Sequence, residues 1–292
     1  MELIARAKLN LYLHVLGRRD DGYHELDSLV AFAALGDRLS VAPAERLSLS
    51  VDGPFADALS CGDNLVLRAG RLLQQRLGLS QGAEMRLEKR LPVAAGLGGG
   101  SADAAAALRG LARLWRVQPE AELMALAAEL GADVPACLAG TPSFTGGVGE
   151  RLQPVPGFPE LGVILANPRI PLPTAAGVSA RTGPFSRPAR WAHALGGGEE
   201  LNAHLEERRN DLTRPALALA PEIGAVLAAL GALPEVRLAR MSGSGATCFG
   251  LTVTASEAER GAEALRARAP GWWVMPSRLL AAGALPGAGE SG

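Results

Sequence analysis

The sequence is poor in the residues that hold small domains together through disulfides or zinc. Its three cysteines, Cys61, Cys137 and Cys248, stand far apart, no CxxC pair is present, and there are only four histidines. An odd and scattered set of cysteines indicates free thiols in a reducing compartment. Because no cysteine pair has ligand spacing, the sequence predicts no structural zinc site and no dedicated metal cage.

Long hydrophobic runs are also missing. No stretch of about 18 apolar residues occurs, and the opening MELIARAKLN carries charges inside its apolar part, unlike a signal peptide. The formal net charge of -1 gives no global attraction to nucleic acid or to an anionic membrane. We therefore expect a cytoplasmic protein without nucleic-acid or membrane partners, in which a local site binds any phosphate.

What is present is ample material for a hydrophobic core. Of the 292 residues, 48% are hydrophobic, and this length is close to the size at which single cores stop growing. After Gly140 the chain becomes rich in glycine and proline, as linkers between domains often are. We expect two domains, residues 1–155 and 156–292.

Hydrophobic periodicity divides the chain into strands and helices. The predicted strands are 5–16, 27–33, 37–41, 47–51, 85–91, 161–168, the two sides of a Gly-rich loop within 236–253, and 272–280. The predicted helices are 64–77 with Asp63 as N-cap, 101–115 opened by Ser101, 119–131, 210–232 with a break at Pro215 and a second start at Pro221, and 256–268. Antiparallel-type strand groups with helices between them predict an α+β fold.

The stretch ARAKLNLYLHV, residues 5–15, alternates apolar with polar residues, which predicts a strand with one buried face. Lys8 and Asn10 are two positions apart and so share the other face. An isolated strand lysine is usually a solvated surface residue, and the alternation does not exclude that interpretation. The alternative interpretation is that the strand holds Lys8 rigidly, in a position where its charge can neutralise an anion.

The segment PVAAGLGGGSADAA, residues 92–105, follows a predicted strand and opens a predicted helix. Its glycines allow a close approach of backbone to ligand, and the helix start offers free N–H groups, so the segment suits phosphate binding. It is neither a Walker A loop, which needs a lysine after the last glycine, nor a GxGxxG loop, because Ser101 stands at the third glycine position. A second loop, MSGSGATCFG at 241–250, suggests a polyphosphate clamped between two lobes.

These segments resemble the GHMP kinases, and the opening residues 7–26, AKLNLYLHVLGRRDDGYHEL, resemble the signature of one family among them, the 4-diphosphocytidyl-2-C-methyl-D-erythritol kinases. LGADVPACLAG at 130–140, GVGE at 147–150 and NDL at 210–212 match that family in order. The resemblance implies a two-lobed GHMP kinase fold, with an N-terminal lobe of the ribosomal protein S5 domain 2-like type and a ferredoxin-like C-terminal lobe.

The activity that the resemblance implies is ATP-dependent phosphorylation of a small molecule. ATP would phosphorylate the 2-hydroxyl of 4-(cytidine 5'-diphospho)-2-C-methyl-D-erythritol, giving the 2-phosphate and ADP, in the non-mevalonate isoprenoid pathway. ATP is then the co-substrate, Mg²⁺ the expected cofactor, and the protein a monomer or weak homodimer.

The resemblance also implies roles for individual residues. Lys8 and Asp133 fall on the catalytic positions, and we expect the two side chains to be in contact. The ATP-binding positions are Asn64, Leu65, Lys89, Pro92, Val93, Ala94, Ala95, Gly96, Leu97, Gly98, Gly99, Gly100, Ser101 and Ala102. The substrate-binding positions are Asn10, Tyr23, His24 and Thr174, with Tyr23 and His24 as the cytosine-recognising pair. The chain departs from the pattern at Ala102, where many relatives have a second serine, and at Val178, where an aromatic residue is common.

Two other interpretations stay open on sequence. One is a GHMP kinase for another acceptor, such as homoserine or a mevalonate phosphate, which the GYHE segment disfavours. The other is a catalytically silent GHMP-fold binding protein, which the presence of both Lys8 and Asp133 disfavours.

Overall fold

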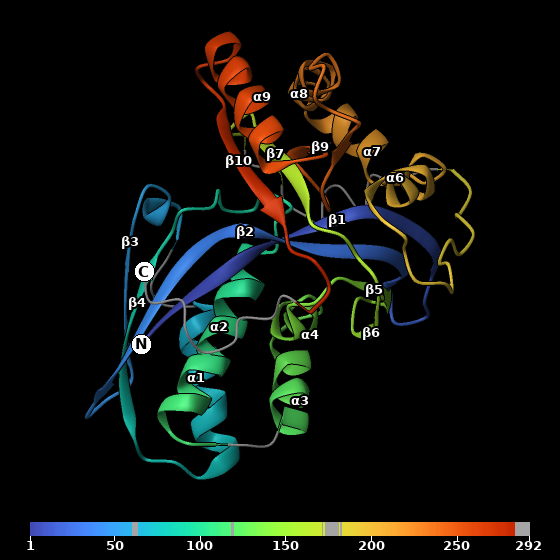
Figure 1. Ribbon diagram of the computed structural model, residues 1–292. Helices are drawn as coiled ribbons and strands as arrows, with labels where there is room; N and C mark the ends of the chain where they lie inside the picture. The colour runs from blue at the N-terminus through green and yellow to red at the C-terminus, as the bar shows by residue number, and fades with distance from the viewer. Residues whose placement is uncertain (60–63, 118–119, 171, 173–180, 182, 284–292) are drawn as a thin grey trace.

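The structure is a computed structural model that describes residues 1–59, 64–117, 120–170, 172, 181 and 183–283. A ten-stranded mixed sheet runs through the molecule, with helices packed on it in two groups (Figure 1). The predicted α+β class is confirmed.

Within the described residues, the first part of the chain forms six strands and four α-helices. They are β1 (Glu2–Arg18), β2 (His24–Ala44), β3 (Ser48–Asp52), the 3-10 turn η1 (Ala56–Ala58), α1 (Leu65–Leu77), β4 (Gly82–Glu88), α2 (Gly99–Leu114), α3 (Glu120–Leu130), α4 (Val134–Ala139), β5 (Ser143–Gly147) and β6 (Arg151–Pro154). The rest supplies β7 (Leu161–Asn167), α6 (Gly198–Glu206), α7 (Thr213–Leu219), α8 (Glu222–Gly231), β8 (Leu238–Met241), β9 (Cys248–Thr252), α9 (Ala255–Arg268) and β10 (Trp273–Leu279).

A long hairpin of β1 and β2 is the centre of the sheet. β2 is one continuous strand, so the expected separate strands at 27–33 and 37–41 were wrong. It pairs with β1 from His24 to Ser40, with β5 near its start and with β4 near its end. The register of β1 and β2 shifts at three points, and such bulges let a long hairpin bend and twist. A single pairing of β2 with β10, at Ala33 and Leu279, joins the two groups of strands.

Two helical layers bury the two ends of the sheet. α1 to α4 lie together beneath β1, β2 and β4, and α2 packs directly on β1 and β2 (Figure 1). The buried alanines of α2, residues 104–107, permit this close approach. At the other end, α8 and α9 pack on β7 and β9, where Ile164, Val226 and Leu265 share one core. None of the helices in the described ranges is long and apolar enough to span a bilayer.

Several predicted helix starts were displaced by a few residues. The N-cap of α1 is Asn64, whose Oδ1 accepts from the Val66 N–H at 2.9 Å, and Asp63 lies outside the described residues. α2 begins at Gly99 with Gly98 as N-cap, so Ser101 stands in its first turn. Pro215 does not break a helix but stands in the first turn of α7, where its missing N–H costs nothing. The second start at Pro221 is confirmed, because this residue is the N-cap of α8.

Candidate active site

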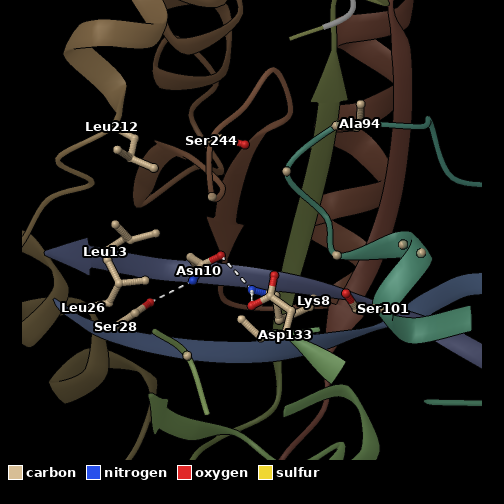
Figure 2. A pocket seen from close by; sticks show the side chains of 18 of the residues that line it. Lys8, Asn10, Leu13, Leu26, Ser28, Ala94, Ser101, Asp133, Leu212 and Ser244 are labelled. Carbon is tan, nitrogen blue, oxygen red and sulfur yellow. Dashed lines mark hydrogen bonds and ion pairs between the residues drawn. The ribbon is translucent and has the colours of Figure 1, made fainter. Parts of the chain in front are cut away.

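A cleft of about 1270 Å³ opens where β1 meets both glycine-rich loops. Pockets for single drug-sized ligands are usually about 300–1,000 Å³, so this cleft has room for more than one small molecule. Its lining brings together residues from the start of the chain, the first glycine-rich loop, the turn before α4 and the second glycine-rich loop (Figure 2).

Lys8 and Asp133 meet at the floor of the cleft. Lys8 Nζ donates to Asp133 Oδ1 at 2.9 Å and to Asn10 Oδ1 at 3.1 Å (Figure 2). The side chain of Lys8 is only 4% exposed, whereas that of Asp133 is 46% exposed, so the carboxylate is open to a ligand. Within the described chain two acceptors occupy two of the three N–H groups of Lys8, which leaves the third for an anion in the cleft.

The backbone around Lys8 is buried on both faces, which the alternation did not predict. All residues from Ala7 to Val15 are buried, because the side of β1 that carries Lys8 and Asn10 faces the two loops rather than solvent. The Lys8 N–H donates to the Leu97 carbonyl at 2.9 Å, which fastens the first loop to β1. The Asn10 amide is fixed in turn, since its Nδ2 donates to Ser28 Oγ at 2.9 Å.

Asp133 reaches the cleft from the short turn between the end of α3 at Leu130 and the start of α4. It is the N-cap residue of α4, a short helix that the sequence pattern did not predict. Pro135 stands in the first turn of α4, where proline is tolerated. The side chain of Asp133 makes no capping bond within α4, so its carboxylate turns to Lys8 instead.

The two glycine-rich loops touch each other beside Lys8. Ser242 Oγ donates to the Gly96 carbonyl at 2.8 Å and accepts from the Asn10 N–H at 3.2 Å. The Thr247 N–H donates to the Ala95 carbonyl at 3.1 Å. Asn210, in the NDL segment, donates to the carbonyls of Met241 and Gly243 and so holds the second loop from behind. Both loops and β1 therefore form one connected backbone cradle.

Gly96 is where the two loops approach most closely, so its substitution should be costly. A Cβ at Gly96 would lie 2.3 Å from the Ser242 carbonyl oxygen, and the φ of +75° is itself unfavourable for other residues. Gly96→Ala should lower the free energy of unfolding by about 3 kcal/mol in urea titrations. The control is Gly78→Ala, which has a φ of +63° but open space around the Cβ, and should lower it by about 1 kcal/mol. Equal losses in the two variants would contradict the tight contact.

Lys89 lies beneath the start of α2 in a buried ion cluster. Its Nζ donates to Asp37 Oδ2 at 2.5 Å and to Asp103 Oδ2 at 2.7 Å. Burial alone would lower the pKa of Lys89, but the carboxylates of Asp103 and Asp37 raise it. Asp37 also accepts from the backbone N–H groups of Arg90 and Leu91, which anchors the chain entering the first loop. Lys89 lines the cleft, yet its charge is already neutralised by two protein carboxylates.

The second carboxylate of this cluster should make the stability depend on pH. Burial raises the pKa of Asp103 to about 7 from an ordinary value of 3.8; Lys89 opposes this rise and Asp37 adds to it. The folded protein then binds this proton more tightly than the unfolded chain, so the contribution of Asp103 is fully present below pH 3.8 and is lost as the pH rises toward about 7.

Asp103→Asn removes this titration while keeping the shape of the side chain. The variant should therefore gain stability relative to the unmodified protein between pH 5 and pH 8, by about 1–3 kcal/mol. Urea unfolding at the two pH values measures the change. A stability difference that stays constant, or that grows toward acid, would contradict the assignment.

The predicted pair Tyr23 and His24 also lines the cleft. Tyr23 is 64% exposed, so its side chain is accessible to a ligand. Burial lowers the pKa of His24, and the nearby cations of Arg18 and Arg181 lower it further. Neutral imidazole is the form that can both donate and accept a hydrogen bond.

The remaining predicted positions are divided between the cleft and segments that are not described. Asn64, Leu65, Ser101 and most of the first loop line the cleft, but Leu97 and Ala102 are buried behind it. Thr174 and Val178 lie outside the described residues.

Sequence reasoning missed Arg18, Arg181, Ser28 and Phe185, which also line the cleft. Only Phe185 carried a signal, as an aromatic residue in a Gly/Pro-rich stretch.

Comparison with known proteins gives consistent matches. The family described as GHMP kinases N terminal domain matches residues 64–141, and GHMP kinases C terminal matches residues 189–271. A 4-diphosphocytidyl-2-C-methyl-D-erythritol kinase of Paramagnetospirillum magneticum is 54% identical over 94% of this chain and 97% of its own length. A crystal structure of 4-(cytidine 5'-diphospho)-2C-methyl-D-erythritol kinase has 39% identity and a TM-score of 0.76, covering 96% of this chain and 99% of that one. Homoserine kinase from Cytophaga hutchinsonii, at 16% identity and a TM-score of 0.66 over 95% of both chains, shares the fold.

Proposed function

The chain belongs to the family of 4-diphosphocytidyl-2-C-methyl-D-erythritol kinases among the GHMP kinases, and from this premise we propose that its cleft joins ATP and the acceptor at Lys8 and Asp133. The protein is an ATP-dependent kinase of the isoprenoid precursor pathway, acting on the cytidine diphosphate conjugate of methylerythritol. The acceptor atom in our proposal is the 2-hydroxyl oxygen.

The observation that carries this proposal is the ion pair of Lys8 and Asp133 beside two contacting glycine-rich loops. Phosphoryl transfer needs positioning and charge neutralisation more than covalent help from the protein. The buried ammonium of Lys8, with one N–H left over, can hold an oxygen of the transferring phosphoryl group. The half-exposed carboxylate of Asp133 can accept the proton of the attacking hydroxyl or orient that hydroxyl in line.

The phosphates of ATP would lie along the first loop, at the N-terminus of α2. Residues 96–100 approach a ligand without side chains, apart from Leu97, which points into the core. Free N–H groups at the start of α2 and its helix dipole favour negative charge there. The missing second serine at Ala102 leaves Ser101 as the hydroxyl of this turn.

Magnesium suits this site as an ion held mainly by nucleotide and water. Asp37 and Asp103 are both engaged by Lys89, so they do not form an open carboxylate cage. Ser101 at the start of α2 offers a neutral oxygen, and Mg²⁺ commonly combines few protein ligands with phosphate oxygens and water. When bound, the ion offsets charge on the β- and γ-phosphates.

The cytidine end of the acceptor would lie at Tyr23 and His24. The Tyr23 ring offers a stacking face, and the imidazole of His24 can bond the cytosine edge. Phe185 also lines the cleft and is 49% exposed, with the Arg181 guanidinium over its ring at 4.8 Å from the centroid. Arg18 and Arg181 supply positive charge for the diphosphate.

An acceptor comparison tests the proposal. ADP formation from ATP should depend on 4-(cytidine 5'-diphospho)-2-C-methyl-D-erythritol and exceed the rate with homoserine or a mevalonate phosphate at least about a thousandfold. Phosphorus NMR of the product should show a new phosphate monoester at the 2-position. A preference for homoserine would identify a kinase for another acceptor, and no acceptor-dependent ADP would identify a silent binding protein.

The cellular setting that we propose follows from the sequence. The described thiols of Cys137 and Cys248 are free and buried, as suits a reducing cytoplasm. The near-zero net charge supports a small-molecule enzyme without nucleic-acid or membrane partners. We propose a monomer or weak homodimer.

A further inference from the structure

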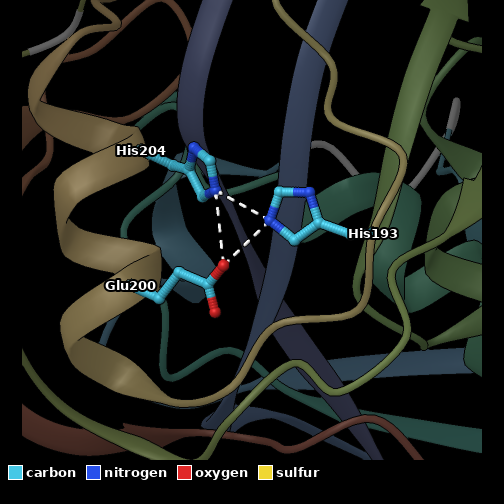
Figure 3. A group of neighbouring side chains, drawn as sticks. All are labelled: His193, Glu200 and His204. Atoms are coloured by element: carbon cyan, nitrogen blue, oxygen red, sulfur yellow. Dashed lines mark hydrogen bonds and ion pairs between the residues drawn. The ribbon is translucent and has the colours of Figure 1, made fainter.

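Two imidazoles and a carboxylate converge on the surface beside α6, away from the cleft (Figure 3). Glu200 and His204 are one helical turn apart on α6 and therefore lie on the same face. His193 comes from the segment that precedes the helix, and its ring turns back toward them (Figure 3). Within the described ranges none of the three lines the cleft, so the chemistry of the kinase reaction does not account for them.

The spacing of the ligand atoms is close to that of a tetrahedral zinc site. Zinc binds imidazole nitrogen at about 2.0–2.1 Å, so two ligand atoms of a regular tetrahedron stand about 3.3–3.4 Å apart. The Nε2 atoms of His193 and His204 are 3.3 Å apart. Glu200 Oε1 is 2.8 Å from His193 Nε2 and 3.9 Å from His204 Nε2. One distance is shorter and the other longer than the separation of two ligand atoms in a regular tetrahedron. Small rotations of the Glu200 side chain suffice to equalise them.

Glu200 and His204 are also oriented by neighbours, as ligands of metal sites are. The other oxygen of Glu200, Oε2, accepts from the Gly196 N–H at 2.6 Å, which leaves Oε1 directed at the imidazoles. The His204 ring stacks on the buried Trp191 ring, with centroids 4.4 Å apart and planes 7° from parallel. His193 is more exposed, which leaves a path for an ion to enter.

We propose that His193, Glu200 and His204 form a binding site for one Zn²⁺ ion, with water as the fourth ligand. The set of two imidazoles and one carboxylate is typical of zinc. Bound zinc would fasten the segment around His193 onto α6. The sequence predicted no structural zinc site because the chain has no cysteine pair with ligand spacing. The proposed ligands are of another kind: Glu200 and His204 at i, i+4 spacing, and His193 seven residues before Glu200.

Titration of the chelator-treated full-length protein with Zn²⁺ by calorimetry tests the proposal. The unmodified protein should bind one ion per chain, and Glu200→Gln and His204→Phe should each weaken binding at least about tenfold. His204→Phe keeps a ring on Trp191, so loss of zinc affinity in this variant does not reflect lost packing. The control, Glu199→Gln, removes an exposed charge from the same turn of α6 and should bind zinc like the unmodified protein.

Thermal melts give a second measurement that does not involve kinase activity. Zinc should raise the melting temperature of the unmodified protein and of Glu199→Gln but not that of His204→Phe, because only ions bound to the folded state stabilise it. The proposal is overturned if no zinc binds, or if Glu200→Gln and His204→Phe bind it as tightly as the unmodified protein does.

Discussion

Lys8→Met should lower kcat for the cytidine diphosphate acceptor by about 10²–10³-fold. The variant loses the buried cation that lies between both glycine-rich loops and Asp133, and removal of one transition-state donor in a dry site commonly costs about 10²–10³ in kcat. The alkyl chain of Lys8 packs closely against Gly98: a Cβ added at Gly98 would lie 3.1 Å from Lys8 Cε. Methionine has a similar length and should fill the same space. Steady-state kinetics at saturating ATP and acceptor measure the effect.

Lys8→Arg is the matched control for this variant. It keeps the positive charge but replaces a compact ammonium with a larger planar group, which cannot repeat the short contacts to Asn10 and Asp133. We expect an activity between those of the methionine variant and the unmodified protein. Near-normal turnover of Lys8→Met, with an unchanged circular dichroism spectrum, would remove Lys8 from the reaction centre.

Asp133→Asn should lower kcat by about 10²–10⁴-fold while the affinity for ATP changes little. The amide keeps the size of the side chain but can no longer accept a proton from the acceptor hydroxyl. Binding of a fluorescent ATP analogue and kcat, measured on the same preparation, separate the two effects. If Asp133 instead served mainly to hold ATP, the nucleotide affinity would fall as much as kcat.

The Lys8→Met, Asp133→Asn double variant extends this test. Residues that act as one unit in a reaction give strongly non-additive losses. The double variant should therefore be little slower than the slower single variant. Fully additive losses would indicate that the two side chains act in separate steps.

Local sequence patterns predicted the strand and the first glycine-rich loop that line the cleft. Alternation placed Lys8 and Asn10 on one side of a strand, and the glycines of residues 92–105 predicted a loop followed by a helix. Asp133 was assigned by resemblance alone. Its predicted place just after the helix at 119–131 is confirmed, because α3 ends at Leu130, but the short helix α4 that begins after Asp133 was not predicted. The contact of Lys8 with Asp133 spans 125 positions in sequence, so no local pattern could supply it.

The sequence also did not predict the ion pairs of Lys89 with residues distant along the chain. Lys89 was expected near the nucleotide, but nothing in its local pattern predicted that Asp37 and Asp103, which are 52 and 14 positions away, would surround it. Burial of β1 on both faces depended in the same way on loops distant in sequence. The division of the chain near residue 155 stays a prediction.

A crystal structure with a non-hydrolysable ATP analogue and the cytidine diphosphate acceptor would show directly whether the two substrates meet at Lys8 and Asp133. We expect the γ-phosphate beside Lys8 Nζ and the acceptor 2-hydroxyl within about 2.6–3.2 Å of the Asp133 carboxylate, with the cytosine ring against Tyr23. An acceptor hydroxyl seated away from Asp133, or a triphosphate that leaves the first glycine-rich loop empty, would contradict this proposal.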